Sequence, residues 1–207
     1  MRNPVRITPR LLSACSIALL LAAVPVAAQS SAKQPIATLP RVNLALTWSG
    51  QHALEAGTGN AFWLQGGSAE VGVHAAAGLS LVGNFTIAHR GSGALASSLD
   101  VFTLTAGPRY TLTGRQLHAS PRFGLFAETL AGMSHGYNSL FPTASGVYSS
   151  ASSFALLTGG GADLHCAHRF ALRLIEVDYM RSGLPNGFGN VQNNLRVASG
   201  ISYSLWP

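Results

Sequence analysis

The chain has 207 residues, of which only 10% are charged, and this fraction is too low for the water-covered surface of an ordinary soluble domain. Three of the positive charges behind its formal net charge of +6 are Arg2, Arg6 and Arg10, so the basic balance belongs largely to the N-terminus and gives no support to nucleic-acid binding. The chain has two cysteines, Cys15 and Cys166, and loss of the first during export would exclude an internal disulfide.

The first 28 residues predict a signal peptide for export. The three arginines precede an apolar run, Leu11–Ala23, and Val26-Ala27-Ala28 supplies the small residues of a cleavage site. A transmembrane anchor is less consistent with the pattern, because the apolar run is short and soon meets Pro25. Cleavage after Ala28 would leave 179 residues with a formal charge of +3. We expect a short unstructured lead-in at 29–40 and one domain at 41–207.

Eight segments of the domain alternate between apolar and small or polar residues, which is the period of a half-buried β-strand. The last is the clearest: its odd positions from Leu195 to Leu205 are mostly large and apolar, whereas its even positions are Arg, Ala, Gly, Ser and Ser. Its eleven residues match the roughly 9–11 that a tilted strand needs to cross a bilayer. The predicted strands are Val42–Trp48, Phe62–His74, Leu79–His89, Val101–Leu112, Arg122–Gly132, Phe154–Leu164, Phe170–Met180 and Leu195–Leu205.

Two of these segments contain irregularities. Gly159-Gly160-Gly161 predicts a sharp bend within its strand. In the seventh segment the apolar positions change from even to odd at Leu174-Ile175, which predicts a β-bulge that returns Arg173 and Glu176 to the same face.

The connections alternate in length. Polar loops rich in Gly, Ser, Asn and His are expected at 50–61, 90–100, 133–153 and 181–190, and shorter turns at 75–78, 113–121 and 165–169. Long loops on one side and tight turns on the other are typical of outer-membrane barrels, with both chain ends on the short-turn side.

The composition of the polar face decides which face lies outside. A soluble lipocalin-like barrel would present that face to water and would carry lysines there, yet Lys33 is the one lysine in the sequence and precedes the predicted strands. Small residues instead suit the narrow interior of eight strands, and the apolar face suits lipid. We therefore predict an all-β fold: an eight-stranded antiparallel up-and-down transmembrane β-barrel.

Seven charged residues fall on the predicted inward faces. Because an unpaired interior charge is costly, a salt-bridge network is the favoured interpretation, and a gate or ion path is the alternative. The residues are Arg109, Arg122, Glu128, Arg173, Glu176, Asp178 and Arg196.

No motif predicts a catalytic, cofactor or metal site. His165-Cys166-Ala167-His168 would need ligands from elsewhere to bind zinc. His89 with Ser92, or His135 with Ser134, would be candidates in a barrel enzyme that acts on membrane lipid, but neither has an acidic third member at a persuasive spacing.

Four segments resemble the small OmpA-like outer-membrane β-barrel proteins of Gram-negative bacteria. They are Phe62-Trp63-Leu64-Gln65-Gly66-Gly67, the run 159–164, Glu176-Val177-Asp178-Tyr179 and the run 192–200. The resemblance implies outer-membrane localisation with a structural, surface-interaction or limited pore role. It also implies contact with membrane lipid and the barrel-assembly machinery, although Pro207 displaces the expected terminal aromatic, Trp206, by one place. Surface ligands would bind the four longer loops. A lipid-modifying enzyme and a soluble lipocalin-like barrel are the alternatives.

Overall fold

The computed structural model describes residues 41–54, 61–91, 98–113, 116–120, 122–186 and 189–205. The predicted signal peptide (1–28), the lead-in (29–40) and the terminal aromatic Trp206 lie outside the described residues, so these remain predictions.

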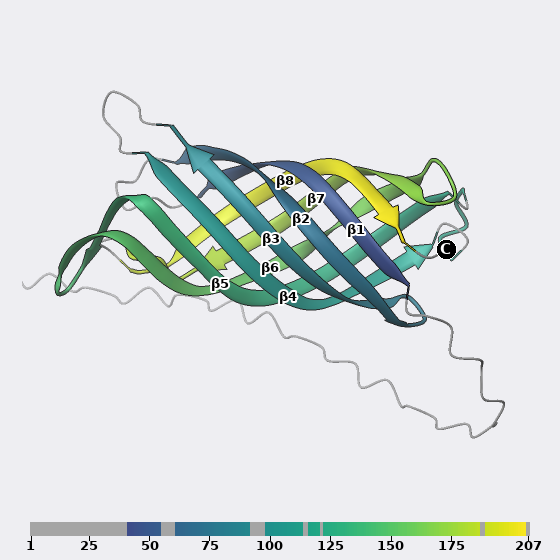
Figure 1. Ribbon diagram of the computed structural model, residues 1–207, viewed down its shortest axis with the longest axis horizontal. Coiled ribbons are helices and arrows are strands. Elements are labelled where there is room, and N and C mark those ends of the chain that lie inside the picture. Colours follow the sequence, from purple (N-terminus) through teal and green to yellow (C-terminus); the bar gives the residue numbers. More distant parts are fainter. Residues whose placement is uncertain are drawn as a thin grey trace, which may run out of the picture. The chain divides into compact units, whose positions relative to one another are not determined.

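Eight antiparallel strands follow one another around a closed barrel, so the predicted fold class is confirmed (Figure 1). The last strand pairs with the first, with Ile201 opposite Leu46, and this pairing leaves no open edge within the barrel wall. The described part of the chain contains no helix that is long and apolar enough to span a membrane. The strands are β1 (Val42–Ala53), β2 (Phe62–Ala76), β3 (Leu79–Arg90), β4 (Leu99–Thr113), β5 (Phe123–Thr143), β6 (Gly146–His165), β7 (Phe170–Ser182) and β8 (Gln192–Ser204).

The apolar face of the barrel points outward and the polar face points inward, as predicted. Leu46, Trp48 and Leu81 are each more than 60% exposed on the outer surface. Strand β8 lies between β7 and β1. Its Val197 and Ile201 face outward, whereas its Arg196 is fully buried. This polarity is the inverse of a water-soluble barrel.

The prediction that 133–153 forms a loop, the longest of those expected, is wrong. Strands β5 and β6 continue through it as a hairpin of 21 and 20 residues that turns at 144–145, and the hairpin extends past the neighbouring strands (Figure 1). Pairing resumes after an irregularity at 138–140 and ends at Thr143 opposite Gly146. Above the barrel both faces of a hairpin can meet water, so the sequence there loses the apolar alternation by which we recognised strands.

The predicted bulge in β7 is confirmed. The register with β8 shifts between Arg173 and Glu176, and Leu174 and Ile175 are both exposed on the outer face. Both charged residues therefore point into the lumen. The bend at 159–161 stays a prediction: β6 continues through these glycines, and its register with β7 shifts just after them, between Ala162 and Asp163.

We call the end of the barrel that holds the start of β1 and the end of β8 the terminal end, since Asn43 is opposite Ser204 there. The opposite end, where the β5–β6 hairpin turns, is the hairpin end.

Candidate functional site

The register of neighbouring strands places opposite charges side by side in the lumen. Arg109 on β4 is directly opposite Glu128 on β5, and Asp178 on β7 is directly opposite Arg196 on β8. Because side chains alternate along a strand, these positions and Glu176, two residues before Asp178, all point inward.

These residues belong to one continuous chain of ion pairs in which acids and arginines alternate. The first three members come from β5, β4 and β2. Arg109 donates from Nε to Oε2 of Glu128 at 2.6 Å and from Nη2 to Oε2 of Glu70 at 2.8 Å. In order, the members of this ion-pair chain are Glu128, Arg109, Glu70, Arg173, Glu176, Arg196 and Asp178.

The second half of the ion-pair chain crosses the lumen to β7 and β8. Nη1 of Arg173 donates to Oε2 of Glu70 at 2.8 Å and to Oε2 of Glu176 at 2.7 Å. Arg196 then donates from Nη2 to Oε1 of Glu176, and from Nε to Oδ2 of Asp178 at 2.8 Å.

Burial makes these pairs interdependent. Glu176, Asp178 and Arg196 are each 0% exposed, so removal of one partner would leave a charge in an interior of low dielectric constant. Phe126 adds apolar and cation–π contact, because its ring lies 4.3 Å from the guanidinium carbon of Arg109 and 4.6 Å from that of Arg173.

Six of the seven charged residues predicted to face inward lie in the ion-pair chain, and Arg122 does not. Arg122 precedes β5 at the terminal end, and its side chain is exposed. Alternation predicts the direction of a side chain only within a strand. Because β5 begins at Phe123, the pattern does not apply to Arg122.

Glu70 and Asp163 were missed as charged participants in the lumen. Glu70 bridges the two halves of the ion-pair chain, and Asp163 accepts from Nε of Arg173 at 3.1 Å. Both lie on the polar face of an alternating segment, so the same criterion that selected the other acids would have found them.

The two ends of the lumen differ. An apolar cluster, Leu64, Ala88, Val101 and Leu184, fills the hairpin end beneath the hairpin. The terminal end holds a cavity of about 110 Å³ that is lined in part by Ser80, Thr111, Asp163 and Arg169, whereas a second cavity at the hairpin end measures only about 10 Å³. The ion-pair chain lies between the two.

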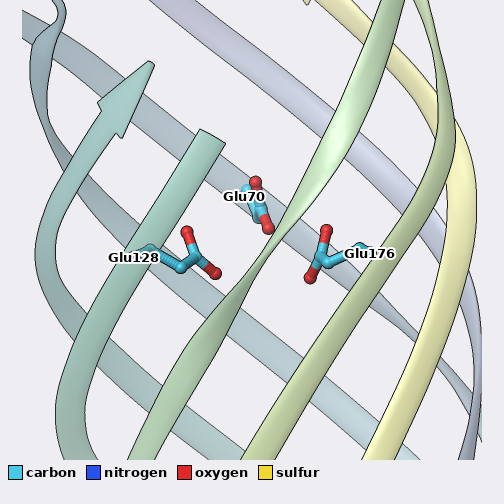
Figure 2. A group of neighbouring side chains, drawn as sticks. All are labelled: Glu70, Glu128 and Glu176. Atoms are coloured by element: carbon cyan, nitrogen blue, oxygen red, sulfur yellow. The ribbon is translucent and has the colours of Figure 1, made fainter. Parts of the chain in front are cut away.

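Three glutamates converge in the ion-pair chain, and Figure 2 shows the carboxylates of Glu70, Glu128 and Glu176 pointing toward one another. One oxygen from each lies within 4.8 Å of the others, a spacing compatible with a metal ion. Each carboxylate already accepts from at least one arginine, however, so a cation would have to compete with guanidinium groups. The donor set is that of a salt-bridge cluster.

The other candidates from the sequence do not form sites in the described part of the chain. Cys166 is exposed in the β6–β7 turn, and His165 contacts the Arg122 carbonyl, so the four-residue His-Cys motif does not converge with other ligands. Ser134 faces the lumen and is hydrogen-bonded to Thr103, so it is not a partner of His135.

The outward-facing histidines have other neighbours. His135 lies 2.7 Å from the hydroxyl of Ser152 through Nδ1, with its ring against Phe102. His89 pairs with Asp100 at 2.5 Å, and its proposed partner Ser92 lies outside the described residues.

Comparison with solved structures places this architecture among small outer-membrane barrels. Ail, the attachment invasion locus protein of Yersinia pestis, matches with a TM-score of 0.54 and 14% identity, over 80% of this chain and 99% of that one. Neisserial surface protein A matches with a TM-score of 0.59 and 10% identity, over 78% and 96%. The outer membrane protein OprG of Pseudomonas aeruginosa matches with a TM-score of 0.51 and 9% identity, over 81% and 97%.

No protein-family model matches the sequence, and no curated protein matches it. At these identities the solved structures establish the fold and nothing finer. The chain has the fold of the small eight-stranded outer-membrane β-barrels, which is the fold that the OmpA-like resemblance implies.

Proposed function

We propose that this protein is an integral outer-membrane β-barrel with a sealed lumen, and that it acts at the cell surface through the β5–β6 hairpin. The N-terminal signal would deliver it for export. Outer-membrane lipid and the barrel-assembly machinery would be its partners in the membrane.

One observation carries the proposal: large apolar side chains surround a closed barrel whose centre is filled by charge. Such a surface is stable in lipid and costly in water, because more than a few hundred Å² of contiguous apolar area is rarely left exposed on a soluble monomer. A water-soluble ligand-binding barrel would need the opposite polarity.

The hairpin supports the surface role. Beyond the barrel wall it carries exposed apolar side chains on two strands, including Leu140, Val147 and Tyr148. Asn138, at φ 57°, donates to Asp100 at 2.6 Å and ties the base of the hairpin to β4. A projection with exposed apolar and hydroxyl groups is suited to contact with another surface.

A lipid-modifying enzyme is the alternative, and the His135–Ser152 contact on the outer face is its best support. The remaining described neighbours of His135 are aromatic rings, Phe102 and Tyr137, where a catalytic histidine would have an acidic partner. We therefore propose a non-catalytic role.

Orientation in the membrane tests the proposal. An epitope inserted between Ala144 and Ser145, at the tip of the hairpin, should bind antibody on intact cells. The same epitope between His118 and Ala119, in the turn at the terminal end, should bind only after the outer membrane has been permeabilised. Antibody binding to both sites on intact cells, or to neither site in the membrane fraction, would contradict a spanning barrel with the hairpin outside.

A further inference from the structure

The ion-pair chain in the lumen begins and ends on an acid. Its seven members are four carboxyl groups and three guanidinium groups, so a fully ionised chain carries one uncompensated negative charge. In a buried site such a charge is expensive, and proteins avoid it by pairing it or by neutralising the group.

The two terminal carboxyls are also the two that are incompletely bonded. Glu70 and Glu176 accept hydrogen bonds at both oxygens. Glu128 and Asp178 accept from arginine at one oxygen only, and Oε1 of Glu128 and Oδ1 of Asp178 are buried without a hydrogen-bond partner. Buried carboxylate oxygens of this kind require a donor.

The barrel brings these two ends to either side of one glycine. Glu128 on β5 is directly opposite Gly159 on β6, and Gly159 is in turn directly opposite Asp178 on β7. A Cβ atom on residue 159 would lie 2.2 Å from Oδ1 of Asp178, so that unbonded oxygen occupies the space where a side chain of β6 would be. No side chain separates the two terminal carboxyls along this row.

We propose that Glu128 and Asp178 together bind one proton at neutral pH. The proton removes the one uncompensated negative charge and brings four acids and three arginines to neutrality. We assign it to the pair and not to either residue alone, because each of the two offers one buried oxygen without a hydrogen-bond partner.

The charged groups in this part of the lumen, the pair itself included, come from six of the eight strands. Strands β1 and β3 contribute neutral side chains, Gln51, Asn84 and Thr86, to the same part of the lumen. Asp163 also pairs with Arg173, but its side chain is 19% exposed beside the cavity at the terminal end, so water solvates the charge that it adds. The charged residues are Glu70 on β2, Arg109 on β4, Glu128 on β5, Asp163 on β6, Arg173, Glu176 and Asp178 on β7, and Arg196 on β8.

A bound proton makes the stability of the barrel depend on pH. An unfolded chain releases the proton above about pH 5, because ordinary carboxyls titrate near pH 4. The folded state then holds one more proton than the unfolded state, so the folding equilibrium constant should fall about tenfold for each pH unit until the pair itself ionises. Stability should therefore decrease as pH rises, opposite to the trend for a carboxylate stabilised in its ionised form.

Infrared spectroscopy of the refolded wild-type protein provides the first test. The carbonyl stretch of a protonated carboxyl should be present at neutral pH and should disappear as pH rises. It should be absent from Glu128→Gln and from Asp178→Asn, each of which leaves three acids with three arginines, and it should persist in the control Asp100→Asn at the hairpin end. No such band in the wild type, or a band that survives in both variants, would overturn the proposal.

Stability provides the second test, because an amide mimics a protonated carboxyl. Glu128→Gln and Asp178→Asn should each unfold at a denaturant concentration no lower than the wild type. Glu176→Gln removes the same charge but breaks contacts with two arginines, so its midpoint should fall. The double variant Glu128→Gln/Asp178→Asn leaves an arginine uncompensated and should be less stable than either single variant.

Two stability results would overturn the proposal. One is a loss in both single variants equal to that of Glu176→Gln. The other is a wild-type midpoint at neutral pH that depends on added sodium or magnesium beyond ionic strength, because the neutralising ligand would then be a metal cation and not a proton.

Discussion

Arg173 has more acidic partners than any other arginine in the described lumen. It contacts Glu70, Asp163 and Glu176, and its guanidinium group lies against the ring of Phe126. Its importance comes from these shared contacts and not from any single pair, because each of the three acids loses a donor if the guanidinium is removed.

Replacement of Arg173 should therefore be severe. Arg173→Met keeps much of the side-chain volume but leaves three acids under-compensated, so we expect a loss of at least about 3–5 kcal/mol in the free energy of unfolding. Denaturant unfolding in lipid vesicles measures this loss. Arg122→Met is the matched control and should lie within about 0.5 kcal/mol of wild type, because Arg122 is exposed. Equal losses of unfolding free energy in the two variants would show that burial does not determine how much the removal of an arginine destabilises the barrel.

Individual residues also show how far sequence reasoning extends into the lumen. Alternation identifies which side chains point inward, and it did so for six of the seven charged residues we named. It does not identify the partners, because Glu70 contacts Arg109 and Arg173, which are 39 and 103 residues away in the chain. The alternation around Glu70 predicts that its side chain points inward. Its contact with both Arg109 and Arg173 depends on closure of the barrel, which the pattern does not show.

Strand β6 approaches its neighbours closely at Gly159, and this approach can be tested with a single methyl group. A Cβ at this position would also lie 2.2 Å from the Val177 carbonyl oxygen, which belongs to the backbone and cannot move without moving β7. Gly159→Ala should cost about 1–3 kcal/mol through this overpacking. Gly83→Ala on β3 is the control, because nothing lies within 4 Å of its Cβ position. Denaturant unfolding of both variants gives the comparison, and equal stability would argue against close packing at β6.

Two substitutions in β8 test which face of the barrel wall contacts lipid and which contacts the lumen. Val197 faces outward, whereas Ser202 lines the cavity at the terminal end. Val197→Arg should cost about 2–4 kcal/mol if this position lies near the middle of the bilayer, and Ser202→Arg should cost less because water reaches the cavity. The measurement is the folded fraction in lipid vesicles over a urea series. The reverse order would mean that the apolar face is not the lipid face.

At the scale of elements, the sequence predicted the strands inside the barrel wall better than those outside it. All eight strands were found because lipid on one side and a narrow lumen on the other impose a two-residue period. The bulge in β7 was visible as a change of phase in that period. The upper halves of β5 and β6 lie where neither constraint acts, so Ser, Gly and Ala there resembled a loop.

At the scale of the whole barrel, two groups of side chains occupy the described lumen along its axis. The ion-pair chain occupies the centre of the lumen, and the apolar cluster around Leu64 and Leu184 occupies the hairpin end. Purified protein in planar bilayers should therefore show little or no steady conductance at neutral pH. Large and long-lived open channels would contradict a sealed lumen and favour a pore.

The position of Glu70 has a consequence for the order in which the barrel is assembled. Arg109 and Glu128 lie on adjacent strands, and so do the charged residues of β7 and β8, so each of these groups can form within a hairpin. Glu70 belongs to β2, which is separated from β4 by β3 alone, so its contact with Arg109 lies within one side of the sheet, whereas it reaches Arg173 on β7 across the enclosed lumen. An unclosed sheet would thus hold two separate charged clusters, one that contains Glu70 and one that contains Glu176. We expect closure between β1 and β8 to join them, so that the last strand pairing and the completion of the buried charges become a single cooperative event with a high contact order.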